Sequence, residues 1–144
     1  HSIPVEAIPK IKEGGDYTKV DGEVVSNWEL TKSAHKPRSY AFCSDTAYHE
    51  KIVSTIEGVD LLYHEATFKN DLKERAALTF HSTTGEAASI AKQAKVGRLI
   101  VGHYSQRYHD LESLLEEVLE VFPNVDLAKE GKVFEIPRTY GANS

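Results

Sequence analysis

Cysteine and methionine are nearly absent from this sequence: Cys43 is the one cysteine among 144 residues, and there is no methionine. A single thiol excludes an internal disulfide and cannot by itself form a thiolate-rich zinc site, so any metal would have to be held by histidine and carboxylate side chains. Since a natural chain starts with methionine and this one opens on His1, we expect it to be part of a longer protein or a processed one.

Long apolar runs and an excess of positive charge are also missing. No stretch approaches the roughly 18 uninterrupted apolar residues of a membrane-spanning helix, and the first residues lack the charged-then-apolar order of a signal peptide. The default expectation is a soluble, cytoplasmic protein with no membrane partner. Lys and Arg number 17 against 22 Asp and Glu, a formal net charge of −5. This is the reverse of the basic balance of domains that bind nucleic acid by bulk electrostatics, so a nucleic-acid contact would need a local site.

The length fits about one domain, and its two parts differ in regularity. Glycine and proline punctuate residues 1–38, where we expect a loop-rich lead-in with a short extended stretch at 19–25. Residues 39–144 alternate predicted strands with predicted helices. The strands are expected at 40–43, 59–63, 98–101, 125–128 and 132–136, and the helices at 47–56, 84–94 and 111–122. This order predicts an α/β layer structure with a substantially parallel central sheet.

Ionisable side chains follow three of these predicted strands directly. Asp45, the pair His64-Glu65 and His103 each stand where a strand ends, and the carboxyl ends of parallel strands form the ligand-binding edge of an open sheet. His81 adds a fourth candidate just before the helix at 84–94, whose dipole disfavours the imidazolium form. His and Asp are ligand types of hydrolytic zinc or manganese sites.

Each of these residues also has a plain structural interpretation. Asp45 alone is more simply the N-cap of a following helix, His103 is as readily a loop histidine, and His64-Glu65 could be a solvated strand end. Their joint occurrence favours a site over four separate coincidences. The remaining histidines have no such placement and are interpreted as surface residues: His1, His35, His49 and His109.

Four short motifs, in this order, closely resemble the C-terminal half of ribonuclease Z, the tRNA 3′-processing endonuclease of the metallo-β-lactamase superfamily. The resemblance covers roughly residues 38–137. The motifs are Ser44-Asp45-Thr46, Leu62-Tyr63-His64-Glu65-Ala66-Thr67-Phe68, Phe80-His81-Ser82-Thr83 and Gly102-His103-Tyr104-Ser105-Gln106-Arg107-Tyr108. The second and third correspond to the HEAT and HST signatures that separate this family from other hydrolases of the same fold. The resemblance implies half of an αββα sandwich, a mixed sheet with its helices on one face.

The resemblance also implies a role for each residue. Asp45 matches the aspartate that bridges two zinc ions, and His103 matches the last histidine ligand of one of them. His81 matches the histidine implicated in protonating the leaving oxygen, with His64 and Glu65 shaping the site and Glu65 orienting His81. Arg107 matches an arginine with a phosphate or structural contact. Two metal ions activating water for phosphodiester hydrolysis suit this set, with precursor tRNA as the substrate.

One part of the family pattern is missing. The main zinc motif of the family, His-x-His-x-Asp-His, does not occur in these 144 residues. Asp45 and His103 alone leave a metal well short of four protein ligands, so we expect weak or no zinc binding and no tRNA cleavage by this chain alone. A missing N-terminal half is the expected partner, and an uncovered sheet face predicts association, with a homodimer as a hypothesis.

Two other functions stay open at this point. The first is another hydrolase of the metallo-β-lactamase fold, acting on a small ester or sulfate, which would share Asp45 and His103 but not the two signatures. The second is a stand-alone α/β binding module without catalysis.

Overall fold

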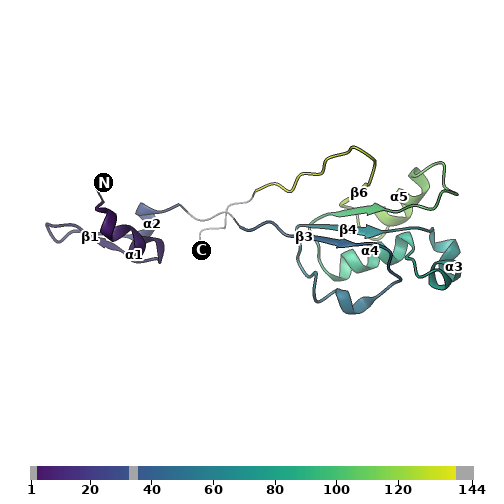
Figure 1. Ribbon diagram of the computed structural model, residues 1–144, viewed down its shortest axis with the longest axis horizontal. Helices are drawn as coiled ribbons and strands as arrows, with labels where there is room; N and C mark the ends of the chain where they lie inside the picture. Colours follow the sequence, from purple (N-terminus) through teal and green to yellow (C-terminus); the bar gives the residue numbers. More distant parts are fainter. Residues whose placement is uncertain (1–2, 33–35, 139–144) are drawn as a thin grey trace. The chain divides into compact units, whose positions relative to one another are not determined.

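The computed structural model describes residues 3–32 and 36–138 (Figure 1). The expectations for His1 and His35 lie outside these residues. The chain divides into two compact units, one made of residues 1–36 and 138–144 and the other of Pro37–Pro137. None of the helices in the described ranges is both long and apolar enough to span a bilayer.

The smaller unit is a short hairpin flanked by helical turns. Its elements are η1 (Val5–Ala7), α1 (Ile8–Lys12), β1 (Tyr17–Thr18), β2 (Val24–Val25) and α2 (Asn27–Leu30), and β1 pairs antiparallel with β2. The Asn27 side-chain amide donates to the carbonyl oxygens of Ile11 at 2.6 Å and Gly15 at 3.0 Å. This asparagine therefore ties α1 to the chain that follows the hairpin.

The larger unit is built on a four-stranded sheet. The strands are β3 (Tyr40–Cys43), β4 (Leu61–Glu65), β5 (Leu99–Gly102) and β6 (Val125–Leu127), in the order β3-β4-β5-β6, and every neighbouring pair is parallel. The α/β class is confirmed. A mixed sheet would contain at least one antiparallel pair of strands. None is found in this sheet among the described residues, so the expectation of a mixed sheet is not met here. The segment 132–136 is not a strand either: it places Phe134 against Arg98 and Lys132, whose charged groups lie 5.6 and 4.6 Å from the ring centroid.

Two helices cover one face of the sheet, as expected. They are α4 (Thr84–Gln93) and α5 (Glu112–Leu119), and the alternation of side chains along the strands turns Leu62 and Val101 toward them. The core between sheet and helices consists of buried aliphatic residues: Ile56, Leu62, Ala66, Ala87, Ala88, Ile90, Ala91, Ala94, Val96, Leu99, Val101 and Val118. Small alanines on α4 let its backbone lie close to the strands.

The prediction of a helix at 47–56 is wrong. Only η2 (Glu50–Ile52) forms there, followed by turns. The stretch is rich in β-branched residues, which lose side-chain freedom in a helix, and Ile56 is buried in the core. Irregular backbone here brings those side chains to the core. Two elements without an expectation, η3 (Asn70–Leu72) and α3 (Lys73–Leu78), lie between β4 and α4.

Candidate functional site

The candidate residues meet because three parallel strands end together. In the pairing register, Cys43 of β3 lies beside His64 of β4, and Glu65 lies beside Gly102 of β5. Asp45 follows β3 and His103 follows β5, so both leave the sheet at the edge where Glu65 ends β4. His81 reaches the same edge from the loop between α3 and α4.

Three of the predicted side chains form one group. Each of Asp45, His81 and His103 offers a ligand atom within 4.8 Å of the others. His103 Nε2 lies 3.3 Å from Asp45 Oδ1, and the rings of His81 and His103 are 5.2 Å apart between centroids. Two imidazoles and a carboxylate are ligand types that protein metal sites use, so this group could hold a metal ion.

The backbone is strained at this group. Asp45 has φ of +49°, His103 has φ of +61°, and Phe80, immediately before His81, has φ of +58°. Residues with a Cβ rarely adopt this left-handed region, and each such conformation costs of the order of 1–3 kcal/mol. Such strain concentrates at functional sites, where the surrounding structure holds side chains in a required direction.

Glu65 lies behind the group and is fully buried. Its carboxylate accepts hydrogen bonds from the Thr46 backbone N–H at 2.6 Å and the Ser82 backbone N–H at 3.2 Å, and His81 Nδ1 lies 3.0 and 3.1 Å from its two oxygens. Thr67 Oγ1 donates to Oε2 at 2.6 Å. Burial alone would raise the pKa of Glu65, but these four hydrogen bonds lower it below its usual value. Glu65 is therefore an ionised, fixed anchor for His81.

Thr67 connects the same carboxylate to the second histidine. Its Oγ1 lies 2.9 Å from His103 Nδ1 and 2.9 Å from the His103 carbonyl oxygen. Because this hydroxyl also contacts Glu65, a single buried carboxylate holds His81 directly and His103 through one threonine.

The structure places His64 and Arg107 apart from the group. The His64 side chain is 1% exposed, and its Nδ1 lies 2.7 Å from the Glu65 carbonyl oxygen. Burial lowers the pKa of this imidazole, so it is neutral at pH 7. Its neighbour Leu62, two residues back on the same side of β4, packs in the core. Arg107 is exposed, four residues beyond His103.

Three residues of the site had no role in the sequence analysis: Thr46, Thr67 and Ser82. Thr67 stands two residues after Glu65, and that spacing in a strand-like segment signals the same side of the chain. Backbone donors such as those of residues 46 and 82 carry no sequence signal, because every residue except proline has one.

Comparison with known proteins gives close relatives. The chain is 50% identical over 131 residues to the ribonuclease Z of Parabacteroides distasonis, and 52% identical over 130 residues to that of Porphyromonas gingivalis. These alignments cover 91% and 90% of this chain but 43% of each relative. The chain thus spans less than half the length of the curated relatives it matches. No protein-family model matches it.

A solved structure supports the fold. The metallo-β-lactamase fold protein YhfI from Bacillus subtilis superimposes with a TM-score of 0.63 and 26% identity, covering 72% of this chain and 47% of YhfI. The chain is therefore a homologue of ribonuclease Z over the C-terminal part of those proteins, and its fold is that of the metallo-β-lactamase fold proteins.

Proposed function

We propose that this chain is the C-terminal part of a zinc-dependent endoribonuclease that removes 3′ trailers from precursor tRNA. The convergence of Asp45, His81 and His103 at one sheet edge, with Glu65 buried behind His81, carries the proposal. The ribonuclease Z relatives support it. Within the chain, residues 39–144 would form the hydrolase part and residues 1–38 a separate lead-in. A cytoplasmic location is expected for an enzyme that acts on this substrate.

The site residues have distinct roles in this proposal. Asp45 and His103 would hold metal, and bound zinc would supply an activated water and charge stabilisation at the phosphate. His81 would give its proton to the departing ribose oxygen as the bond from phosphorus to that oxygen breaks. Glu65 fixes the His81 ring through Nδ1, so Nε2 is the nitrogen that would carry the transferred proton. Arg107, exposed beyond His103, is available to a phosphate. His64 would act from the core side, through its contact with the Glu65 carbonyl.

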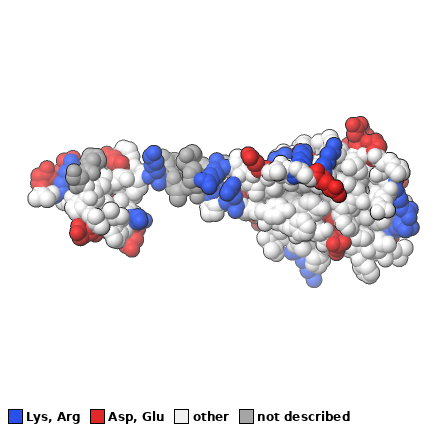
Figure 2. All heavy atoms as spheres, turned by 45° about the horizontal axis from the view of Figure 1, so that its top comes forward, with Lys and Arg blue, Asp and Glu red and all other residues white. Residues whose placement is uncertain are grey.

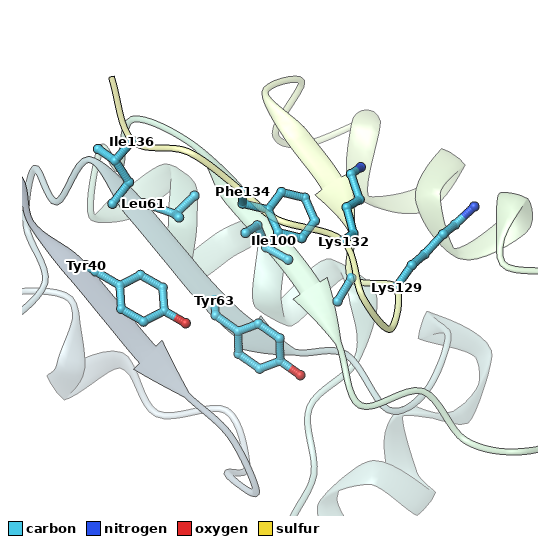
Figure 3. Close-up of a pocket in the computed structure, with 9 residues that line it drawn as sticks. Tyr40, Leu61, Tyr63, Ile100, Lys129, Lys132, Phe134 and Ile136 are labelled. Carbon is cyan, nitrogen blue, oxygen red and sulfur yellow. The ribbon is translucent and has the colours of Figure 1, made fainter. Parts of the chain in front are cut away.

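The face of the sheet opposite α4 and α5 carries exposed aromatic side chains, which favours a binding partner that is not part of this chain. Tyr40 and Phe42 are 55% and 63% exposed there, and the Phe42 ring stacks on Tyr63 with centroids 4.6 Å apart. A groove of about 510 Å³ opens on this face, with Tyr63 and Ile100 pointing up from the strands and Phe134 lying over them (Figure 3). Exposed aromatic surface of this kind marks an interaction site.

We assign this face to the missing N-terminal half, the part expected to carry the His-x-His-x-Asp-His motif. A homodimer through the same face is the competing arrangement. Either cover would remove the aromatic side chains from water.

Mixing the two halves tests the proposal. The chain would be combined with the separately produced N-terminal part of the Porphyromonas gingivalis ribonuclease Z, in zinc-containing buffer, and assayed on a precursor tRNA. We expect no cleavage by either half and cleavage at the 3′ side by the mixture. Hydrolysis of a small phosphodiester without tRNA cleavage would instead favour another metallo-β-lactamase-fold hydrolase. A complex without any hydrolysis would favour a binding module.

A further inference from the structure

Helix α3 ends in a turn that leads directly into His81. The backbone N–H of His81 donates to the carbonyl oxygen of Ala76 at 2.9 Å, and that of Phe80 donates to the carbonyl oxygen of Ala77 at 3.4 Å. These two bonds form a Schellman motif, in which the residue after the helix cap adopts the left-handed conformation. Phe80 is that residue, with φ of +58°. The motif therefore fixes how the chain passes from the helix into the site.

Phenylalanine is unfavourable in this turn. Glycine is the usual residue there because it has no Cβ, and a bulky residue with positive φ is an outlier. Burial of the ring does not offset the strain, since Phe80 is 75% exposed, and Leu78, two residues earlier, is 80% exposed. Strain without a packing gain is found where a residue serves a binding site. The ring therefore has its role in contact with a ligand.

The position of the ring next to His81 indicates which ligand this is. Consecutive Cα atoms are 3.8 Å apart, and Glu65 holds the His81 imidazole at the sheet edge, with Nδ1 3.0 Å from Oε1. The helix before them lies beyond the end of β4 (Figure 1). An RNA strand whose departing oxygen takes a proton from His81 therefore also passes close to Phe80. Its bases offer flat faces on which an aromatic ring stacks.

An arginine without an acidic partner lies on the same helix. Arg75 is exposed, and its guanidinium lies 6.0 Å from the centroid of the Phe68 ring. The Phe68 ring in turn lies 6.3 Å from the His81 ring. Among residues 3–32 and 36–138, no carboxylate forms an ion pair with Arg75. Its charge is therefore not neutralised within the described chain, and guanidinium groups bind phosphate.

We propose that Phe80 and Arg75 bind an unpaired nucleotide beside the scissile bond of the RNA substrate. The Phe80 ring stacks on the base and the Arg75 guanidinium pairs with a phosphate, two contacts by which proteins bind single-stranded RNA. Stacking accepts all four bases, so this contact positions the strand at His81 without selecting a sequence. The inference rests on the proposed function, which supplies the RNA substrate, and adds two binding residues to it.

Binding of single-stranded RNA to the full chain tests the inference without any cleavage. A short fluorescein-labelled oligouridylate is titrated with the chain, and fluorescence anisotropy follows binding at several salt concentrations. Phe80→Gly should weaken binding roughly 5- to 150-fold, the equivalent of one lost stacking contact, and Phe80→Tyr should retain it. Arg75→Ala should lower the slope of log affinity against log salt by about 0.7, the value for one phosphate contact on a single strand. Phe80→Gly should leave that slope unchanged.

Thermal unfolding separates a binding role of Phe80 from a structural one. Phe80→Gly relieves the left-handed strain, so its melting temperature should rise by a few degrees while its RNA affinity falls. Trp28→Ala and Lys51→Ala are the matched controls, at an exposed aromatic residue and an exposed lysine outside the site. Both should bind RNA as the unsubstituted chain does.

The outcomes separate this inference from the proposed function. Unchanged RNA affinity in Phe80→Gly, a lower melting temperature of that variant, or no RNA binding by the unsubstituted chain would overturn the inference. An unchanged salt slope in Arg75→Ala would overturn the phosphate contact. Weaker association of Phe80→Gly with the N-terminal part of the relative, at unchanged RNA affinity, would assign the ring to that partner instead. The tRNA assay with mixed halves decides the proposed function separately.

Discussion

At the scale of single residues, Glu65 organises the site although it belongs to no ligand set. One buried carboxylate accepts four hydrogen bonds and, directly or through Thr67, contacts both histidines. The sequence allowed Glu65 to be placed at a strand end and, through the family resemblance, behind His81. The spacing of Thr67 from Glu65 places both on one side of the chain, but only the fold brings Thr67 beside His103.

A glycine beside His103 has a specific packing reason. A Cβ at Gly102 would lie 2.8 Å from both Cε2 and Cζ of Tyr63. We expect Gly102→Ala to lower the free energy of unfolding by about 1–3 kcal/mol, the usual cost of overpacking. Urea denaturation measures this change in the free energy of unfolding. In a Tyr63→Ala background the same change should cost clearly less, since the obstructing ring is gone. Equal costs in the two backgrounds would show that Tyr63 is not the obstacle.

The contribution of Asp126 to the free energy of unfolding is expected to depend on pH in the acid range. Burial opposes the shift, but hydrogen bonds from Lys132 and Arg98 lower the pKa of Asp126 below the ordinary 3.8. A folded-state pKa below the unfolded value means that the stabilisation is complete above the unfolded-state pKa and is lost as pH falls through the folded one.

The measurement is unfolding by urea between pH 2 and 7. Asp126→Asn should remove at most about 1 kcal/mol at pH 7, because this pair is partly exposed, and should flatten the fall of stability below pH 3.8. Glu57→Gln, at an exposed carboxylate, serves as control. An Asp126→Asn curve parallel to wild type at every pH would refute the assignment.

At the scale of elements, α4 was the most predictable. Its capping box is present in both directions: Glu86 N–H donates to Thr83 Oγ1 at 3.2 Å, and Thr83 N–H donates to Glu86 Oε2 at 2.9 Å. The expected bounds of 84–94 differ from Thr84–Gln93 by one residue. A local hydrogen-bond pattern set this boundary, so the sequence carried the information.

Removing that cap should destabilise the larger unit. Thr83→Ala is expected to cost about 1 kcal/mol of unfolding free energy, because it leaves a helix N–H without its acceptor. Thr83→Ser keeps the hydroxyl oxygen and should cost much less. Thermal unfolding compares the three proteins, and equal losses for alanine and serine would assign the effect to the methyl group instead of the cap.

The elements that sequence patterns missed depend on tertiary contacts. The stretch 47–56 has helical spacing but places Ile56 in the core through turns. The segment 132–136 alternates like a strand, yet Phe134 lies against Arg98 and Lys132. In both cases one packing partner, the core around Ile56 or Arg98 beside Phe134, comes from a distant part of the chain that no local pattern contains.

At the scale of the whole molecule, charge distribution agrees with a locally defined site. Figure 2 shows basic and acidic side chains side by side on the visible face of the larger unit, and the net charge of the chain is −5. Substrate binding would then depend on the geometry at the strand ends more than on bulk attraction. The parallel order of the strands followed from their alternation with helices, and that order alone placed Asp45, Glu65 and His103 at one edge.

In the proposed function, His81 is the acid of a tRNA-processing nuclease completed by a second half. The most direct measurement is the single-turnover rate of precursor tRNA cleavage by the two mixed halves, comparing wild type, His81→Gln and His49→Gln. We expect cleavage at the wild-type rate with His49→Gln and a rate lower by roughly 10²- to 10⁴-fold with His81→Gln, the usual contribution of an acid catalyst. Cleavage by His81→Gln at the wild-type rate would contradict it.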